Sequence, residues 1–386
     1  MLCMAVVCGC CIAGSRGDWL YWVGVNLLRC LWLIDEVLAL ADNPPPPQPF
    51  FLLRRWVPLF RWQLLLLALF ASGGIGIAVW MESRRSPVVA VPVSSWPGYE
   101  YMSLAAHQGF DRAQGIRLDV RRYRDSQLIV QDLAWGRLQV AQLTTVELVD
   151  LCARVPRRCP VVVLVVNASH GADQLLLAAD VPNLAALKGQ VVAVSPSTLG
   201  PFLVQQALER VGLRLSDVTL RNVALEAMPA GFTSGSIKAA AMYPPFSAWA
   251  LRTGKARVAF DSRAIPGQIL DVLVVDRSFL ATNPAVVAGL LRAWQAAHAY
   301  ARREPRTADA WLAAQQGLSL AEFGSVQRGL VYQPLQDQVT LLAPGGAMEQ
   351  NLRAVQRVQA RVGLVPENQA LPQVSNGPLR QALQLP

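Results

Sequence analysis

The sequence has few of the residues on which most enzymes rely for proton transfer, and it lacks the glycine patterns that bind nucleotides. Histidine occurs only three times in 386 residues, and none of the three lies in a zinc-hydrolase H-x-x-E-H pattern. No G-x-G-x-x-G follows the first predicted strand and no P-loop occurs, which excludes a Rossmann dinucleotide site and a P-loop NTPase. We therefore expect neither catalysis nor a cofactor.

Acidic residues are also scarce, with 26 against 35 lysines and arginines, and the formal net charge is +9. The basic residues are scattered as pairs such as Arg121-Arg122 and Arg302-Arg303. No basic helix with interleaved aromatics and no zinc-finger spacing is present. The charge therefore does not predict nucleic-acid binding. It is typical of solvated surface arginines, and an arginine beside a membrane can contact anionic headgroups.

Charge is absent altogether from residues 62–81, WQLLLLALFASGGIGIAVWM. A helix of this length spans roughly 30 Å, the thickness of a bilayer's hydrocarbon core, and Trp62 and Trp80 lie where interfacial aromatics belong. The segment predicts an N-terminal transmembrane helix that anchors the following body. A cleaved signal peptide is the alternative, although no small-x-small cleavage site and no lipobox cysteine follow. Residues 1–61 form an N-terminal extension with a Pro-rich spacer.

Five of the seven cysteines lie in the first thirty residues, so cysteine is rare in the rest of the chain. The other two, Cys152 and Cys159, flank a predicted connection from a helix to a strand. No His or Cys stands at metal-ligand spacing from them, so a metal site is not expected. In an oxidising compartment the pair can close a short disulfide loop, and two free thiols in a loop are the alternative.

From residue 88 onward, short β-branched runs alternate with amphipathic segments, which is typical of βα units around largely parallel sheets. The pattern predicts an α/β body over residues 88–340 and a C-terminal helical tail over 341–386. The predicted strands are 88–94, 117–123, 138–143, 160–167, 174–178, 190–194, 218–222, 237–241, 257–260 and 271–275. The predicted helices are 101–108, 126–135, 146–154, 201–211, 284–303 and 348–361.

One short arrangement occurs twice in this body. At Gly136 and again at Gly235, a predicted helix stops at a glycine suited to the left-handed C′ position, and a short strand follows. The first strand leads to a pair of threonines and the second to Tyr243. Because ligands bind at strand ends in α/β sheets, two such ends facing each other predict a cleft between two lobes.

Three segments carry a resemblance to a known family. They are SWPGYE at 95–100, GRLQVA at 136–141 and LAALKGQVVAV at 184–194. Their order and spacing resemble those of the nitrate/sulfonate/taurine-type substrate-binding proteins of ABC transporters, to which the thiamine-pyrimidine synthases are related. The resemblance covers roughly residues 88–340, nearly the whole body.

The resemblance implies a type II periplasmic-binding-protein fold, in which two α/β lobes close on the ligand by hinge motion. It implies a first lobe over 88–175 and 265–340 and a second lobe over 176–264. Gln139 and Lys238 stand where the family often has Asp, and Pro244 stands where many relatives have Glu. These departures leave the identity of the ligand open.

Aromatic candidates for ligand contact follow two of the predicted strands. Trp96 and Tyr99 lie in a Pro-Gly turn, where they can stack on a planar ligand or wall an apolar pocket; packing on their own lobe is the alternative. Tyr243 is expected on the facing wall of the cleft.

Polar candidates follow other strands. Thr144 and Thr145 can hydrogen-bond a polar head group or cap the next helix, and the two roles are compatible. Ser195, Ser197 and Thr198 precede a helix whose N-terminus can cradle an anion, with helix capping as the alternative.

Two further polar candidates lie elsewhere in the body. Asn167 can bridge a ligand or fix the hinge. Glu226 can bind an amine or a ring N–H, and an exposed loop residue is the alternative.

The resemblance, together with the uncharged segment at 62–81, implies an extracytoplasmic solute-binding protein of an ABC-type importer. Its expected partners are a small polar organic or oxyanion ligand, an ABC permease and the inner membrane. The expected location is the periplasmic side of that membrane, anchored, or the periplasm if the segment is cleaved. A ligand-sensing receptor for a membrane signalling partner is an alternative. A thiamine-pyrimidine-synthase-like enzyme is another, and the absence of that enzyme's cysteine motif counts against it.

Overall fold

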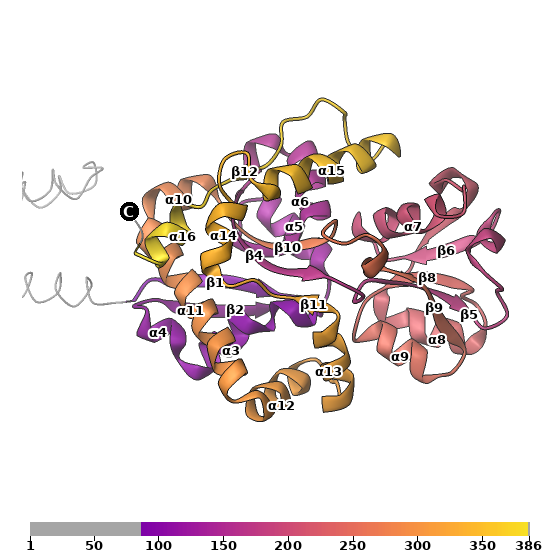
Figure 1. Cartoon of the computed structure of the whole chain (residues 1–386), viewed down its shortest axis with the longest axis horizontal. Coiled ribbons are helices and arrows are strands. Elements are labelled where there is room, and N and C mark those ends of the chain that lie inside the picture. The colour runs from indigo at the N-terminus through magenta and orange to yellow at the C-terminus, as the bar shows by residue number, and fades with distance from the viewer. Residues whose placement is uncertain (1–85, 385–386) are drawn as a thin grey trace, which may run out of the picture. The chain divides into compact units, whose positions relative to one another are not determined.

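The computed structural model describes residues 86–384, which form two α/β lobes joined by two chain crossings (Figure 1). The predicted membrane segment at 62–81, the Pro-rich spacer and the five N-terminal cysteines lie outside the described residues. Within residues 86–384, no helix is both long enough and apolar enough to cross a membrane.

The larger lobe combines strands from the first part of the chain with strands that return after the smaller lobe. They are β1 (Val88–Val93), β2 (Arg117–Arg122), β3 (Val140–Thr144), β4 (Val161–Ser169), β10 (Leu270–Val275), β11 (Leu330–Val331) and β12 (Gln373–Val374). β10 lies between β3 and β4 and runs antiparallel to both. β11 and β12 pair with opposite ends of β4. β1 pairs with β2 in parallel and lies next to β3.

The two central strands are almost continuously apolar. β4 reads VVVLVVNAS and β10 reads LDVLVV, and every residue of β10 is buried. Such runs are typical of strands that are covered on both faces. Asp271 is the one ionisable residue in either strand, and it stands at the start of β10 beside Asn167 of β4. A carboxyl in this position needs a specific partner, because burial penalises its charged form.

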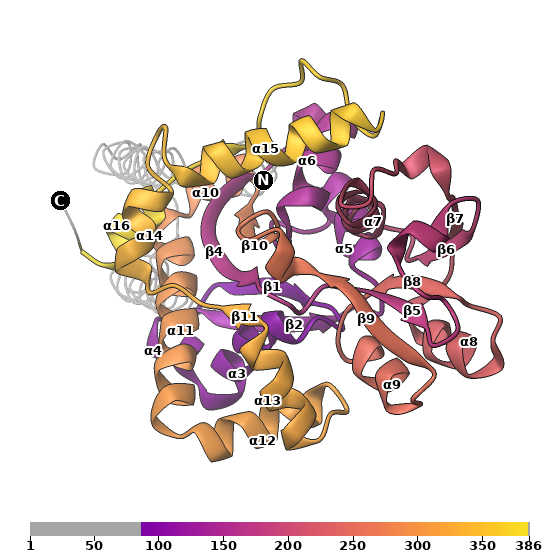
Figure 2. The same ribbon diagram turned by 45° about the vertical axis from the view of Figure 1, so that its right-hand side comes forward.

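The helices of the larger lobe cover its sheets (Figure 2). The long α11 packs on α3 and α16, and α15 packs on α6. The helices of this lobe are α3 (Glu100–Gln108), α4 (Phe110–Ala113), α5 (Ser126–Ala134), α6 (Thr145–Arg154), α10 (Arg277–Thr282), α11 (Pro284–Arg303), α12 (Pro305–Gln315), α13 (Leu320–Arg328), α14 (Leu335–Leu341), α15 (Ala347–Arg361) and α16 (Gly377–Ala382).

The smaller lobe is a five-stranded sheet in the order β7-β6-β8-β5-β9. Its strands are β5 (Gln174–Ala178), β6 (Val191–Val194), β7 (Thr219–Asn222), β8 (Ala239–Met242) and β9 (Ala256–Asp261). α7 (Leu199–Glu209) lies on one face, and α8 (Met228–Ser234) and α9 (Phe246–Arg252) lie on the other (Figures 1 and 2). Parallel and antiparallel pairs are mixed, because β5 runs antiparallel to both β8 and β9.

Two crossings join the lobes, one between β4 and β5 and one between β9 and β10. Serine hydroxyls tie them together. Ser169 Oγ lies 2.7 Å from Ser262 Oγ, and the backbone N–H of Gly171 donates to Ser262 Oγ at 2.6 Å. β5 begins at Gln174, so the sheet of the smaller lobe starts two residues before residue 176, the first residue expected for that lobe.

Most predicted strands and helices of the body are present within a few residues of the predicted bounds. Those at 174–178 and 284–303 have the bounds expected. The left-handed glycines are confirmed, with φ of 73° at Gly136 and 77° at Gly235. In the predicted tail, α15 is held on α6 by Gln359 Nε2, which donates to the Val146 carbonyl at 3.0 Å.

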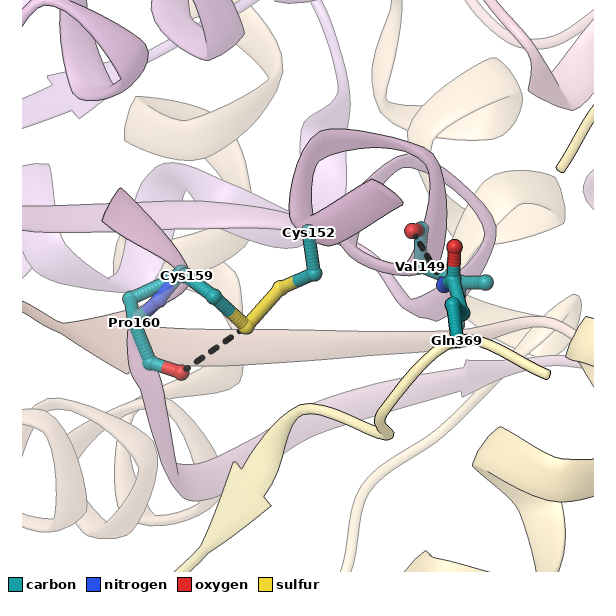
Figure 3. Close-up of a disulfide and its surroundings, with 5 residues drawn as sticks. All are labelled: Val149, Cys152, Cys159, Pro160 and Gln369. Atoms are coloured by element: carbon teal, nitrogen blue, oxygen red, sulfur yellow. Dashed lines mark hydrogen bonds between the residues drawn. A yellow bond between two sulfur atoms is a disulfide. The ribbon is translucent and has the colours of Figure 1, made fainter. Parts of the chain in front are cut away.

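Cys152, near the end of α6, is joined to Cys159, just before β4 (Figure 3). Their Cα atoms lie 4.6 Å apart, which suits a disulfide. Beside the bridge, Gln369 Nε2 donates to the Val149 carbonyl at 2.9 Å and holds the C-terminal segment on the same helix (Figure 3). The bridge thus fixes the connection from α6 into the central strand.

Peptide mapping tests this bridge. Trypsin cuts after Arg154, Arg157 and Arg158, all of which lie between the two cysteines. The flanking peptides should therefore migrate as one linked species without reductant and separate with it. Replacing both cysteines by serine should lower the free energy of unfolding by about 2 kcal/mol, because the short loop is no longer closed in the unfolded chain. Separate peptides from protein exported to the periplasm would contradict the bridge.

Candidate functional site

A cavity lies between the lobes at the ends of several strands. It is lined by Ser94, Trp96, Tyr99, Ser126, Thr144, Glu147, Asp173, Ser197, Leu199, Tyr243 and Asp271. The space left inside is about 20 Å³, which is little more than one water molecule needs. The lobes are thus closed on each other, and their own side chains fill most of the cleft.

Aromatic side chains from both lobes meet in this cavity. Trp96, after β1, contacts Tyr243, after β8, edge to face with ring centroids 5.3 Å apart. Ser95 Oγ lies 3.3 Å from the Tyr243 hydroxyl. Trp96 is only 5% exposed, which shows how completely the two lobes cover it. A planar ligand between the lobes would replace this aromatic contact with contacts of its own.

Tyr99 forms the strongest polar contact on the cavity wall. Its hydroxyl donates to Asp271 Oδ1 at 2.6 Å, and both residues are buried. Burial raises the pKa of Asp271 well above its ordinary range, and the neighbouring Asp173 and Glu147 raise it further, while the Tyr99 bond lowers it. Burial and the same carboxyl raise the pKa of Tyr99. The hydroxyl therefore stays protonated and serves as a donor.

Thr144 caps α6 through a capping box with Glu147. Its hydroxyl accepts from the Glu147 backbone N–H at 3.1 Å, while Glu147 Oε2 accepts from the Thr144 backbone N–H at 3.0 Å. Ser126 donates to the other Glu147 oxygen at 2.7 Å. The capping role is therefore present, and Thr144 lines the cavity at the same time.

The segment before α7 presents hydroxyls without capping the helix. Thr198 is the N-cap residue, but its side chain makes no capping bond, and its buried Oγ1 has no partner among the described residues. Ser195 Oγ and Ser197 Oγ lie 3.2 Å apart. Of the three residues, Ser197 alone lines the cavity.

The structure brings five of the sequence-predicted residues into the cavity and leaves the other ligand candidates outside it. Those that line it are Trp96, Tyr99, Thr144, Ser197 and Tyr243; those that do not are Thr145, Asn167, Ser195, Thr198 and Glu226. Asn167 and Thr145 are fully buried behind the wall, with side-chain polar atoms that have no partner in the described part of the chain. Glu226 is exposed, in a short 3₁₀ turn at Leu225–Ala227.

Three acidic residues of the cavity were not among the sequence candidates: Glu147, Asp173 and Asp271. One sequence signal could have identified Asp271, because a carboxylate at the start of the apolar run LDVLVV cannot face solvent in a buried strand. Asp173 lies in the crossing before β5, where only the fold shows that it reaches the cleft. Ser94, Ser126 and Leu199 were missed for the same reason.

Ion pairs bridge the lobes at the rims of the cleft. Arg252 of α9 lies 3.0 Å from Glu322 of α13, and Arg361 of α15 lies 3.6 Å from Glu209 of α7. The arginines are more than half exposed, so each pair contributes little to stability. Their arrangement is consistent with a closure that is readily reversed.

Two α/β lobes that close over a cavity at their strand ends define a two-lobed binding-protein fold. The chain belongs to the NMT1-like family, whose model matches residues 87–315, more than half of the sequence. A Brucella abortus protein described as a binding protein is 22% identical over 222 residues, which cover 57% of this chain and 68% of the relative.

Solved structures have the same fold. The alkanesulfonate-binding protein SsuA from Xanthomonas axonopodis pv. citri, bound to MOPS, aligns with a TM-score of 0.61 over 74% of this chain and 96% of its own, at 16% identity. The desulfurization enzyme DszB aligns with a TM-score of 0.57 over 77% and 99%, at 20% identity. The fold is thus that of the periplasmic binding proteins, and it is shared by at least one enzyme.

Proposed function

We propose that this protein is the extracytoplasmic solute-binding component of an ABC-type importer. The observation that carries the proposal is the cavity at the strand ends of two lobes, walled by Trp96 from one lobe and Tyr243 from the other. Lobes that close on each other bury a ligand between them and present a changed surface to a permease. The family and the sulfonate-binding structures support this function.

The first test is a thermal-shift screen against taurine, alkanesulfonates, nitrate, bicarbonate, pyrimidines and simple amines. A compound that binds the folded form alone raises the melting temperature, and the rise grows with the logarithm of its concentration above the dissociation constant. A hit should also change the separation of the lobes, which small-angle X-ray scattering detects as a change in the radius of gyration. Saturable binding that leaves the lobe separation unchanged would argue against a transport receptor of this fold.

The aromatic walls should be essential for binding. Trp96→Ala and Tyr243→Ala should each weaken the affinity of the best hit at least about thirtyfold, since truncating a buried aromatic anchor commonly costs 2 kcal/mol or more. Trp135→Ala is the matched control, because Trp135 is 60% exposed on the same lobe as Trp96. Isothermal titration measures all three variants. Equal losses in Trp96→Ala and Trp135→Ala would place the site elsewhere.

Two observations separate this function from its alternatives. Genes for a permease and an ATPase beside this one favour an importer, whereas a neighbouring kinase or cyclase favours a sensor. The DszB likeness concerns the fold alone. Recovery of the bound compound unchanged after prolonged incubation distinguishes a binding protein from an enzyme, because an enzyme would return a product.

A further inference from the structure

Three carboxyl groups line the cavity, and we call them the cavity carboxyls: Glu147, Asp173 and Asp271. Each is less than a tenth exposed. They come from three separate parts of the chain, namely the first turn of α6, the crossing before β5 and the start of β10. None of the other residues that line the cavity is a lysine, an arginine or a histidine. The wall therefore carries acidic groups without a counter-charge.

The protein's own hydrogen bonds satisfy these groups unequally. Both Glu147 oxygens accept hydrogen bonds: Oε1 accepts from Ser126, and Oε2 accepts from Thr144. Asp271 accepts at Oδ1 from Tyr99. Its Oδ2 and the Nε1 of Trp96 are both buried without a full hydrogen bond among the described residues. Burial raises the pKa of Asp271, and the nearby Trp96 indole lowers it. An unpaired buried oxygen of this kind is costly unless a ligand supplies a donor. Asp271 lines the cavity and is 1% exposed, so it is the carboxyl best placed to accept from a ligand donor.

The pKa values of the cavity carboxyls reflect their burial without a positive charge nearby. Burial raises the pKa of all three, and Glu147 raises the pKa values of both Asp173 and Asp271. Burial between the closed lobes therefore favours the protonated forms of these groups. A bound positive charge would stabilise their ionised forms and remove this penalty.

A metal ion is the less suitable counter-charge. Among residues 86–384, no three His, Cys, Asp or Glu side chains lie close enough together to ligate one ion. The aromatic part of the wall suits an organic group instead, because the face of Trp or Tyr attracts ammonium and guanidinium groups. Trp96 and Tyr243 line the same cavity, where their rings meet edge to face.

We propose that the bound solute is a small organic cation whose protonated amine or amidine group donates to Asp271 and is neutralised by the cavity carboxyls. This inference rests on the proposed solute-binding function and narrows its ligand class. A sulfonate or nitrate would find no lysine, arginine or histidine on the wall to neutralise it, and it could bind only while the carboxyls kept their protons. The acidic wall thus distinguishes this cleft from an oxyanion site.

Pairs of probes that share an aromatic group but carry opposite charges test the inference on the full-length chain. Phenethylamine is compared with 2-phenylethanesulfonate, and benzamidine with benzenesulfonate, within a metabolite screen of cations, zwitterions, neutral compounds and anions. The amine and amidine should bind at least about a hundredfold more tightly than their sulfonate partners, since only the cations can form ion pairs with the cavity carboxyls. Isothermal titration gives the affinities, and this comparison needs no variant to fold.

Variants then assign the effect to the wall. Asp271→Asn should weaken binding of benzamidine at least about thirtyfold, because one partner of a buried charge pair is lost. Asp180→Asn should leave it unchanged, because Asp180 pairs with Lys238 at the surface, outside the cavity. Circular dichroism shows whether each variant is folded.

The possible outcomes separate the two proposals. Tighter binding of the cations, lost in Asp271→Asn, supports both. Preferred binding of the sulfonates, or cation binding that Asp271→Asn leaves intact, overturns the cation inference while the solute-binding function stands. Failure of every charge class in the screen to bind saturably counts against the solute-binding function, and the inference falls with it.

Discussion

Asp173→Asn should make the ligand-free protein more stable, and the gain should grow as the pH rises. Burial raises the pKa of Asp173 from its ordinary 3.8 to about 7, helped by the charge of Glu147 and opposed by a hydrogen bond with Ser169. An asparagine has nearly the same shape and no charge to bury. The substitution therefore removes a penalty that the wild-type protein bears at neutral pH.

The direction of the pH dependence follows from proton binding. Between pH 4 and 7 the folded, closed protein holds a proton on Asp173 that the unfolded chain has already lost, so the stability of the wild type falls as the pH rises through this range. The advantage of Asp173→Asn should thus increase by about 2 kcal/mol between pH 5 and pH 7.5. The other titratable groups that line the same cavity are Tyr99, Glu147, Tyr243 and Asp271.

Urea unfolding of both proteins at pH 5 and pH 7.5 measures this difference. Asp180→Asn is the control, because that carboxyl is exposed and its pKa is lowered by Lys238. The free energy of unfolding of Asp180→Asn, relative to that of the wild type, should not increase between pH 5 and pH 7.5. A constant difference between Asp173→Asn and the wild type at the two pH values would show that the closed cleft does not hold Asp173 protonated.

The sequence predicted the fold well because local patterns determine most of it. Alternating apolar runs and helical periodicity located every strand of the three sheets except β11 and β12, and glycines at 136 and 235 marked two helix ends through their positive φ. The short helices α12–α14 were not predicted individually. They lie in an alanine- and glutamine-rich stretch whose apolar periodicity is weak.

The site was only partly predictable. Residues in loops directly after strands, such as Trp96 and Tyr243, were found because strand ends are where ligands bind. Glu147 and Asp271 were missed because they stand inside a helix and a strand, and Asp173 was missed because nothing local distinguishes it from other residues of the loop after β4. Glu147 resembles an ordinary capping residue and Asp173 an ordinary loop residue, and only the folded lobes bring them together with Asp271. Chain crossings are long-range features that sequence periodicity does not encode.

Gly98→Ala should damage both stability and ligand binding, although the substitution adds one methyl group. Gly98 lies in the turn between Trp96 and Tyr99. A Cβ at this position would lie 2.4 Å from Asn167 Nδ2 and 2.6 Å from Trp96 Nε1. Both neighbours are buried, so neither can move aside without displacing the wall of the cavity. Overpacking of this kind typically costs about 1–3 kcal/mol.

Gly324→Ala is the matched control, because the same methyl group there meets nothing closer than 3.7 Å, the end of the Arg328 side chain. Gly324 lies inside α13, where alanine should stabilise the helix by about 0.5–1 kcal/mol. The two substitutions should thus change the free energy of unfolding in opposite directions. Gly98→Ala alone should also weaken ligand binding, at least about tenfold, since Trp96 is displaced. Wild-type affinity in Gly98→Ala would show that the position of Trp96 does not determine binding.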